Sequence, residues 1–110
     1  MSFREAQDTV ARWVDRSREG YFPPLTNLAR LTEEVGELAR EINHQFGEKP
    51  KKPGESPGSI EMELADILFV VICLANSRQI DLDGAFAAMM QKLSTRDALR
   101  WTRRSDRGAP

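Results

Sequence analysis

The chain has 110 residues, of which 40% are hydrophobic and 30% are charged, and its formal net charge is −1. This length predicts one small domain, and the near-neutral charge gives no general attraction to a nucleic acid polymer or an acidic membrane. The amino terminus lacks the apolar core of a signal peptide, and the apolar run 67–75 is shorter than the roughly 20 residues that span a bilayer. We therefore expect a cytoplasmic protein without a membrane segment.

Apolar residues recur at helical spacing in four segments. These run from 2 to about 18, from 25 to 43, from 59 to 78, and from about 81 or 83 to the polar, basic stretch that begins at 97. Ser59 is the expected N-cap of the third helix. Prolines and glycines break the chain after the first helix and throughout a long loop at 45–59. No segment favours a strand. The sequence thus predicts an all-α, four-helix domain over 1–104, followed by a flexible tail at 105–110.

Two of these helices carry strong apolar surfaces. In the second, one stripe is expected to face the core: Leu28, Leu31, Val35, Leu38 and Ile42. The third is apolar on every side between 67 and 75, and its Cys73, the sole cysteine, is expected to be buried. Three amphipathic helices from one short chain would not cover it. We therefore expect packing into a helical-bundle homo-oligomer.

Acidic residues form one cluster on each of the two central helices. The second helix carries Glu33-Glu34-x-x-Glu37, and the third carries Glu63-x-x-Asp66. Positions three apart project to one side of a helix, so an antiparallel packing would bring the two clusters together. Several adjacent carboxylates require cations to remain ionised, and Mg²⁺ prefers oxygen ligands and often shares phosphates. A solvated acidic face is the alternative. A di-iron bundle would need Glu-x-x-His pairs, which neither cluster contains.

Basic residues downstream and in the loop are candidates for binding a polyphosphate. On the fourth helix Lys92 and Arg96 are four residues apart and share a face, and the loop adds Lys49, Lys51 and Lys52. Cations near a metal–carboxylate centre would neutralise phosphate oxygens, although solvated surface charges are the alternative for all five. The sequence has no Gly-x-x-x-x-Gly-Lys-Ser/Thr phosphate loop.

The aromatic residues divide by their local sequence. Trp13 and Phe22 are expected to be core residues. Tyr21 and Trp101 lie in less regular, polar stretches and are the candidates for stacking on a nucleobase. No serine–histidine or cysteine–histidine pairing suggests covalent catalysis.

The two acidic motifs, in this order and with Lys92-x-x-x-Arg96 downstream, resemble the MazG-like nucleoside triphosphate pyrophosphohydrolases of the all-α NTP pyrophosphatase superfamily. The stretches 31–44, 46–52, 65–70 and 73–77 look like the short single-domain members of the YpjD type. The similarity covers roughly 20–104. It implies a helical homodimer or homotetramer that uses Mg²⁺, with Mn²⁺ as a substitute. The reaction would cleave a nucleoside or deoxynucleoside triphosphate to the monophosphate and pyrophosphate, as in house-cleaning of the nucleotide pool.

The resemblance also implies roles for individual residues. The metal ligands would be Glu34, Glu37, Glu63 and Asp66, with Glu33 orienting or deprotonating the attacking water. Phosphates would be held by Lys92 and Arg96, and by the loop lysines. Three alternatives stay open: a dUTPase-like enzyme, a phosphoribosyl-ATP pyrophosphohydrolase, and a noncatalytic helical protein that binds nucleotides.

Overall fold

The computed structural model describes residues 1–48, 50–54 and 58–96, and the predicted tail at 105–110 lies outside them. The described residues form four helices and no strand, which confirms the all-α fold class. In chain order they are α1 (Phe3–Val14), α2 (Pro24–Phe46), α3 (Ile60–Ser77) and α4 (Leu82–Arg96). No helix among the described residues combines the length and apolar character needed to cross a bilayer.

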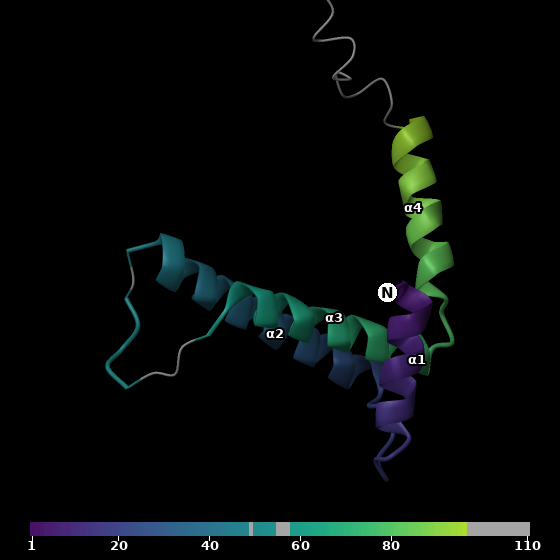
Figure 1. The fold of residues 1–110 in the computed structure, drawn as a ribbon, viewed down its shortest axis with the longest axis horizontal. Helices are drawn as coiled ribbons and strands as arrows, with labels where there is room; N and C mark the ends of the chain where they lie inside the picture. The colour runs from purple at the N-terminus through teal and green to yellow at the C-terminus, as the bar shows by residue number, and fades with distance from the viewer. Residues whose placement is uncertain (49, 55–57, 97–110) are drawn as a thin grey trace, which may run out of the picture.

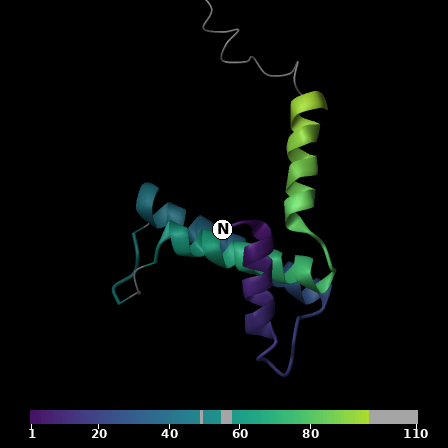
Figure 2. The ribbon, with the colours of Figure 1, turned by 45° about the vertical axis from the view of Figure 1, so that its right-hand side comes forward.

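Among the described residues, the most extensive contact between helices joins α2 to α3, which lie side by side and antiparallel (Figure 1). Helix α1 crosses the end of α3, and α4 rises from the same corner and projects away from the α2–α3 pair. The rotated view in Figure 2 shows the same arrangement. The fold therefore has one packed layer, made by α1, α2 and α3, and one extended arm, made by α4.

Local signals explain where the helices begin. Ser2 and Glu5 form a capping box at the start of α1. Pro24 occupies the first turn of α2, where a missing backbone N–H leaves no helical bond unmade. Ser59 caps α3 by accepting a hydrogen bond from the Met62 backbone N–H at 3.1 Å. The prediction of Ser59 as an N-cap is confirmed.

The first helix is shorter than predicted. It ends at Val14 rather than near residue 18. The reason is a tight turn, in which the backbone N–H of Arg16 and Ser17 donate to the carbonyls of Trp13 and Val14. Gly20 then adopts a φ of +68°, a left-handed conformation that glycine accepts without steric cost. This turn sends the chain back toward the start of α2.

The inner face of α2 is more polar than the predicted stripe. Its less exposed positions recur every three or four residues and include two buried polar side chains: Asn27, Leu31, Glu34, Leu38 and Glu41. Three members of the predicted stripe, Leu28, Val35 and Ile42, are instead exposed. The apolar stripe is wider than the surface that α3 covers, so one of its edges faces α3 and the other stays open.

The core is built mainly from α3. Its buried apolar residues are Val70, Ile72, Cys73 and Ala75, joined by Val14 of α1. The predicted burial of Cys73 is confirmed. Two other α3 residues, Leu64 and Leu68, remain about half exposed, so the described residues do not cover this apolar helix on every side.

A buried glutamine fixes the corner from which α4 projects. The Gln7 side-chain amide donates to the Asn76 side-chain oxygen at 2.9 Å and to the Ile80 carbonyl at 2.8 Å. Its oxygen accepts from the Leu82 backbone N–H at 3.1 Å. The Phe3 and Phe86 rings also pack with their centroids 5.4 Å apart. The base of α4 is thus anchored to α1 and α3, while its far end extends away from both.

Candidate active site

Three carboxylates from α2 and α3 converge between the two helices. One oxygen each from Glu34, Glu63 and Asp66 lies within 4.8 Å of the other two, and all three residues are half-buried. The antiparallel packing produces this cluster, because it places the middle of α2 beside the first two turns of α3 (Figure 1). Three acidic groups at this separation and partly shielded from water repel one another strongly.

The electrostatics of the cluster are most evident at Glu63. Partial burial raises the pKa of the Glu63 carboxyl, and the nearby Asp66, Glu37, Glu34 and Glu41 raise it further. Each of these causes disfavours the ionised form of Glu63. A bound cation would act in the opposite direction by balancing the accumulated negative charge.

The two other acidic residues of the first motif lie outside this triad. Glu37 is exposed one turn beyond Glu34, and its charge is near enough to raise the pKa of Glu63. Glu33 is exposed as well, and successive residues on a helix point about 100° apart. Among the described residues, the structure therefore gathers Glu34, Glu63 and Asp66 into one cluster, with Glu37 beside it and Glu33 farther around α2.

The basic residues are distributed unevenly around the cluster. Lys92 and Arg96 are exposed on the distal part of α4, which points away from the α2–α3 pair (Figures 1 and 2). In the loop, Lys51 forms an ion pair with the buried Glu41 at 3.1 Å, and Lys52 is exposed. Lys49 lies outside the described residues. Within one chain, the α4 pair is not brought to the carboxylates.

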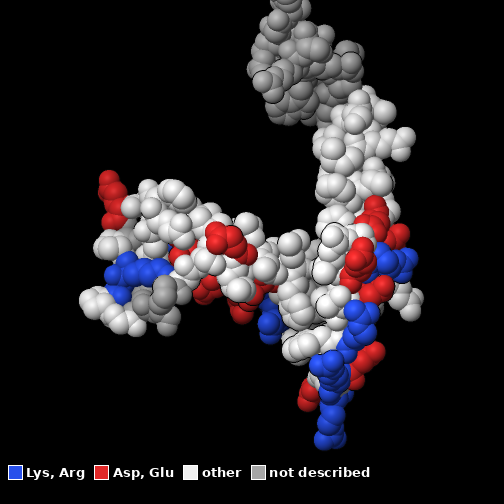
Figure 3. All heavy atoms as spheres, viewed as in Figure 1, with Lys and Arg blue, Asp and Glu red and all other residues white. Residues whose placement is uncertain are grey.

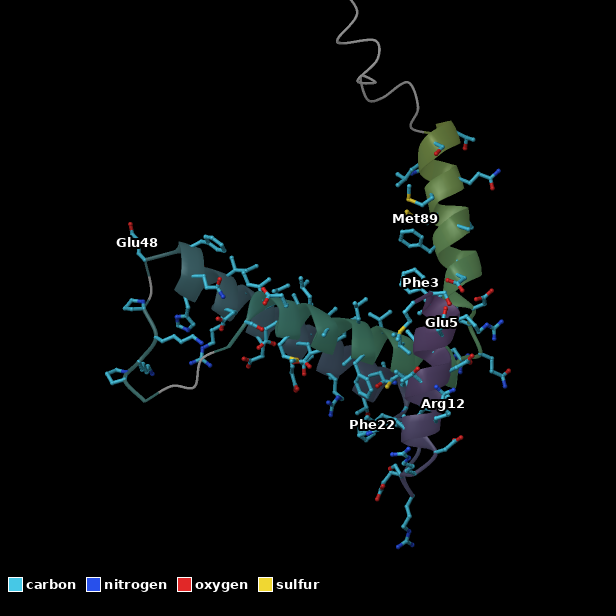
Figure 4. The ribbon with its side chains drawn as sticks, viewed as in Figure 1. Phe3, Glu5, Arg12, Phe22, Glu48 and Met89 are labelled. Carbon is cyan, nitrogen blue, oxygen red and sulfur yellow. The ribbon has the colours of Figure 1, made fainter. Side chains whose placement is uncertain are left out.

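Figure 3 shows one face of the molecule, on which acidic atoms gather over the α2–α3 pair and the visible surface of α4 is largely uncharged. The exposed residues of α4 include four large apolar side chains: Phe86, Met89, Met90 and Leu93. In Figure 4 the Met89 side chain lies on the same side of α4 as the ring of Phe3. This side of α4 is an apolar surface with no covering element among the described residues beyond its anchored base.

A cavity lies toward α1, and its lining residues Arg30 and Phe69 are about one helical turn from Glu34 and Asp66. Its volume is about 340 Å³, and it is bounded by α1, the turn that follows it, α2 and α3. The lining is mostly apolar and aromatic, and comprises Trp13, Val14, Ser17, Glu19, Gly20, Tyr21, Phe22, Asn27, Arg30, Phe69, Val70 and Cys73. Trp13 is 60% exposed and Phe22 44% exposed. The prediction that these two are core residues is wrong, because they form the open wall of a cavity.

Of the cavity residues Tyr21 and Arg30, only Tyr21 is predicted from the sequence as a candidate for substrate binding. Tyr21 lines the cavity, and its hydroxyl accepts a hydrogen bond from the Asn76 amide at 3.1 Å. Trp101 lies outside the described residues. Arg30 was not singled out by its sequence context, since one arginine on a helix is usually a surface charge. It lines the cavity four residues before Glu34, and its guanidinium lies 5.4 Å from the centroid of the Phe22 ring.

Comparison with known proteins identifies relatives over most of the chain. Residues 22–101 match the family model of the MazG nucleotide pyrophosphohydrolase domain. YpjD of Bacillus subtilis strain 168, a protein described as uncharacterized, is 51% identical over 105 residues, which are 96% of this chain and 95% of that protein.

Two crystal structures have the same fold. One is that of YpjD from Bacillus subtilis, with a TM-score of 0.77 and 50% identity, covering 86% of this chain and 97% of the other. The second is a Bacillus-conserved MazG protein described as a nucleotide pyrophosphohydrolase. It gives a TM-score of 0.75 at 48% identity, over 88% of this chain and 94% of that one.

Proposed function

The chain belongs to the MazG nucleotide pyrophosphohydrolase family and is an enzyme of that type; on this premise we propose that it hydrolyses nucleoside or deoxynucleoside triphosphates to the monophosphate and pyrophosphate with the help of Mg²⁺, or Mn²⁺ in its place. The observation that supports this activity most directly is the convergence of Glu34, Glu63 and Asp66 within 4.8 Å.

The donor set fits a hard divalent cation. All three groups are carboxylates, and oxygen ligands are those that Mg²⁺ and Mn²⁺ prefer. No histidine or cysteine belongs to the cluster among the described residues, so its composition does not favour zinc. Mg²⁺ usually binds to one or two protein carboxylates and completes its shell with water and substrate phosphates. A cluster of this size suits such shared coordination.

We assign the roles in the site as follows. Glu34, Glu63 and Asp66 hold the cation, and Glu37 joins them through a change of rotamer, since it lies one turn from Glu34 on the same side of α2. A cation bound there supplies Lewis-acid chemistry that activates water and neutralises phosphate oxygens. Glu33, exposed next to Glu34, orients the attacking water or accepts its proton.

The negative charge of the triphosphate also requires protein cations. Arg30 lies one helical turn before Glu34 on the same side of α2, and side chains four residues apart on a helix are neighbours. Lys51 of the loop is held by an ion pair with Glu41, a buried residue of the same helix, at 3.1 Å. We propose that both contact phosphates, and that Lys49 and Lys52 of the same loop assist them.

The remote position of α4 leads to a proposal about assembly. The protein forms a homodimer or homotetramer in which Lys92 and Arg96 of one protomer reach the carboxylates of another. The apolar side chains left open on α2, α3 and α4 support this assembly, because exposed apolar surface of this extent commonly marks a protein interface: Leu28, Val35, Leu64, Leu68, Phe86 and Met89. Burying these residues would also cover the apolar α3.

A panel of nucleotides tests the activity. The purified protein is incubated with the common nucleoside and deoxynucleoside triphosphates and with modified ones, with Mg²⁺, with Mn²⁺ or with a chelator. Monophosphate and pyrophosphate are then quantified. We expect both products in equal amounts and only with metal. Binding without either product would mean that the chain is a noncatalytic nucleotide-binding protein, and uracil-only turnover would assign it as dUTPase-like.

A further inference from the structure

Glu41 is a buried carboxylate of α2 that belongs to neither acidic motif. An ionised side chain is costly to bury without a partner, and the partner here is Lys51, whose ammonium nitrogen lies 3.1 Å from a Glu41 oxygen. We propose, resting on the function proposed above, that Glu41 is a positioning residue, which holds the ammonium group of Lys51 where it contacts the phosphates of the substrate.

The ion pair lies on the side of α2 that carries the carboxylate cluster. Glu41 follows Glu34 by seven residues, and about two helical turns return a side chain to the same side of a helix. With a rise of about 1.5 Å per residue, the two positions are about 10 Å apart along the helix axis. Burial and the neighbouring carboxylates raise the pKa of Glu63, and Glu41 is one of those neighbours. Glu41 is therefore within electrostatic range of the cluster.

Contacts at the start of α3 also place the Lys51 ammonium group near the cluster. A Cβ added at Gly58 would lie 2.7 Å from a Glu41 oxygen and 3.5 Å from the Lys51 nitrogen. Gly58 directly precedes Ser59, whose carbonyl accepts a hydrogen bond from the Glu63 backbone N–H at 3.1 Å. The first turn of α3 thus separates the ion pair from Glu63. An extended phosphate chain, bound through a cation on the cluster, can reach across this turn to Lys51.

The two side chains differ in their exposure, and this difference suits a division of roles. The side chain of Lys51 is 27% exposed and that of Glu41 is 8% exposed, so the lysine presents more surface to a ligand. An ammonium group has three N–H donors, and it can donate to Glu41 and to a phosphate oxygen at the same time. Gln45 donates to the other Glu41 oxygen at 3.1 Å. Because a lysine stem is flexible, a carboxylate fixed in this way preorganises its ammonium group for an anion.

Pyrophosphate is the probe for this role, because it carries phosphate groups without a nucleoside. Its affinity is measured by isothermal titration calorimetry on the full chain at a fixed, saturating concentration of Mg²⁺. The wild type is compared with Lys51→Met, with Glu41→Gln and with the double variant. The matched control is Glu48→Gln, which removes the same charge from the same connection at an exposed side chain that points outward in Figure 4.

We expect Lys51→Met to weaken pyrophosphate binding about tenfold, since a hydrogen bond to a charged group is lost. Glu41→Gln should also weaken it, by up to about tenfold. This direction is diagnostic, because removal of a negative charge near an anion would by itself strengthen binding. The double variant should bind no more weakly than Lys51→Met, because Glu41 acts through Lys51 and the two effects are not additive. Glu48→Gln should bind like the wild type.

Several results would overturn the proposal. Pyrophosphate affinity that is unchanged in Lys51→Met, or unchanged or stronger in Glu41→Gln, would do so. An equal loss from Glu41→Gln with and without Lys51 would do so as well, because Glu41 would then act on the fold alone. If Glu41→Gln does not fold, Gly58→Ala takes its place, since its added methyl group displaces the carboxylate without changing any charge. It should weaken pyrophosphate binding in the same way, and unchanged affinity would refute the role.

The result is separable from the proposed hydrolysis. A wild-type protein that releases pyrophosphate from triphosphates, while Lys51→Met binds pyrophosphate normally, would refute the positioning role and leave the activity intact. The expected pattern of affinities without any turnover would support the positioning role and refute the activity. A wild type that binds no pyrophosphate would overturn the positioning role, and the nucleotide panel then decides on the activity alone.

Discussion

The ammonium group of Lys51 lies 3.1 Å from a carboxylate oxygen of the buried Glu41, and this ion pair fastens the connection between α2 and α3 to the inner face of α2. Gln45 donates a second hydrogen bond to Glu41 at 3.1 Å. Gly58, at the other end of the connection, packs against the same carboxylate, since a Cβ added there would lie 2.7 Å from its oxygen. Glu41 therefore organises both ends of the segment that leads into the acidic site.

The Glu41 interactions predict a specific dependence of stability on pH. Hydrogen bonds from Gln45 and Lys51 lower the pKa of Glu41. A carboxyl whose pKa is depressed by folding contributes stability above its unfolded pKa and loses that contribution as pH falls through its folded pKa. Urea denaturation at several pH values between 7 and 3 should therefore show the wild type more stable than Glu41→Gln near neutral pH, with the gap closing in acid. A gap that is independent of pH would show that the charge of Glu41 does not matter.

Two glycine-to-alanine substitutions should have effects of opposite sign. At Gly58 the added methyl group would meet the Glu41 carboxylate at 2.7 Å, so the ion pair must shift, and we expect a loss of about 1–3 kcal/mol. At Gly36, inside α2, an added Cβ meets nothing within 4 Å. There the better helix propensity of alanine should stabilise the protein by up to about 1 kcal/mol. Thermal and urea denaturation measure both, and destabilisation by Gly36→Ala would contradict the open environment of that site.

Removing one carboxylate from the cluster should lower the enzymatic activity and raise the stability of the metal-free protein. Without metal, the mutual repulsion of Glu34, Glu63 and Asp66 destabilises the fold, so Glu63→Gln should raise the melting temperature of the metal-free protein. The same substitution removes a proposed metal ligand. Pyrophosphate release should therefore fall at least about a hundredfold, which is the upper end of the loss seen when even an outer-shell partner is removed.

The matched control for this variant is Glu61→Gln, which removes the same charge from the exposed surface of the first turn of α3. It should leave turnover unchanged. Mg²⁺ or Mn²⁺ should raise the melting temperature of the wild type and of this control, because a ligand that binds only the folded state stabilises it, and should barely affect Glu63→Gln. Wild-type turnover by Glu63→Gln would show that the cluster is not the catalytic centre.

The sequence predicted the four helices because their periodicity, caps and breakers are local properties of the chain. It also predicted that Glu34, Glu37, Glu63 and Asp66 would converge, since antiparallel packing of two neighbouring helices has few alternatives, and all of these except Glu37 form the cluster. The inner face of α2 was harder to predict. There Asn27 and Glu41 are buried in preference to Leu28 and Val35, because burial depends on which edge of a wide stripe α3 covers, and periodicity does not contain that information.

The cavity was missed for a similar reason. Trp13 and Phe22 are large aromatic residues, which composition alone assigns to a core. In the structure they lie on either side of the tight turn that follows Val14 and of the left-handed Gly20, and both line the cavity there. Arg30 becomes a candidate functional residue only because its guanidinium lies over the Phe22 ring and because it is one turn before Glu34. Such relationships arise from tertiary packing, and no short motif marks them.

Arg96 is the last residue of α4 and lies away from the carboxylates of α2 and α3. If a partner protomer supplies Arg96, an Arg96→Ala protomer and an Asp66→Asn protomer should each be nearly inactive alone. Loss of one preorganised phosphate contact commonly reduces turnover by about 10²–10³. Co-expressed in one cell, the two variants should regain activity, because a mixed assembly contains one site with both groups intact. A mixture of Asp66→Asn with Glu63→Gln is the matched control, since both groups belong to the same protomer's cluster and no mixed site can restore them. Activity in that control, or none in the first mixture, would refute a shared site and leave α4 without a part in catalysis.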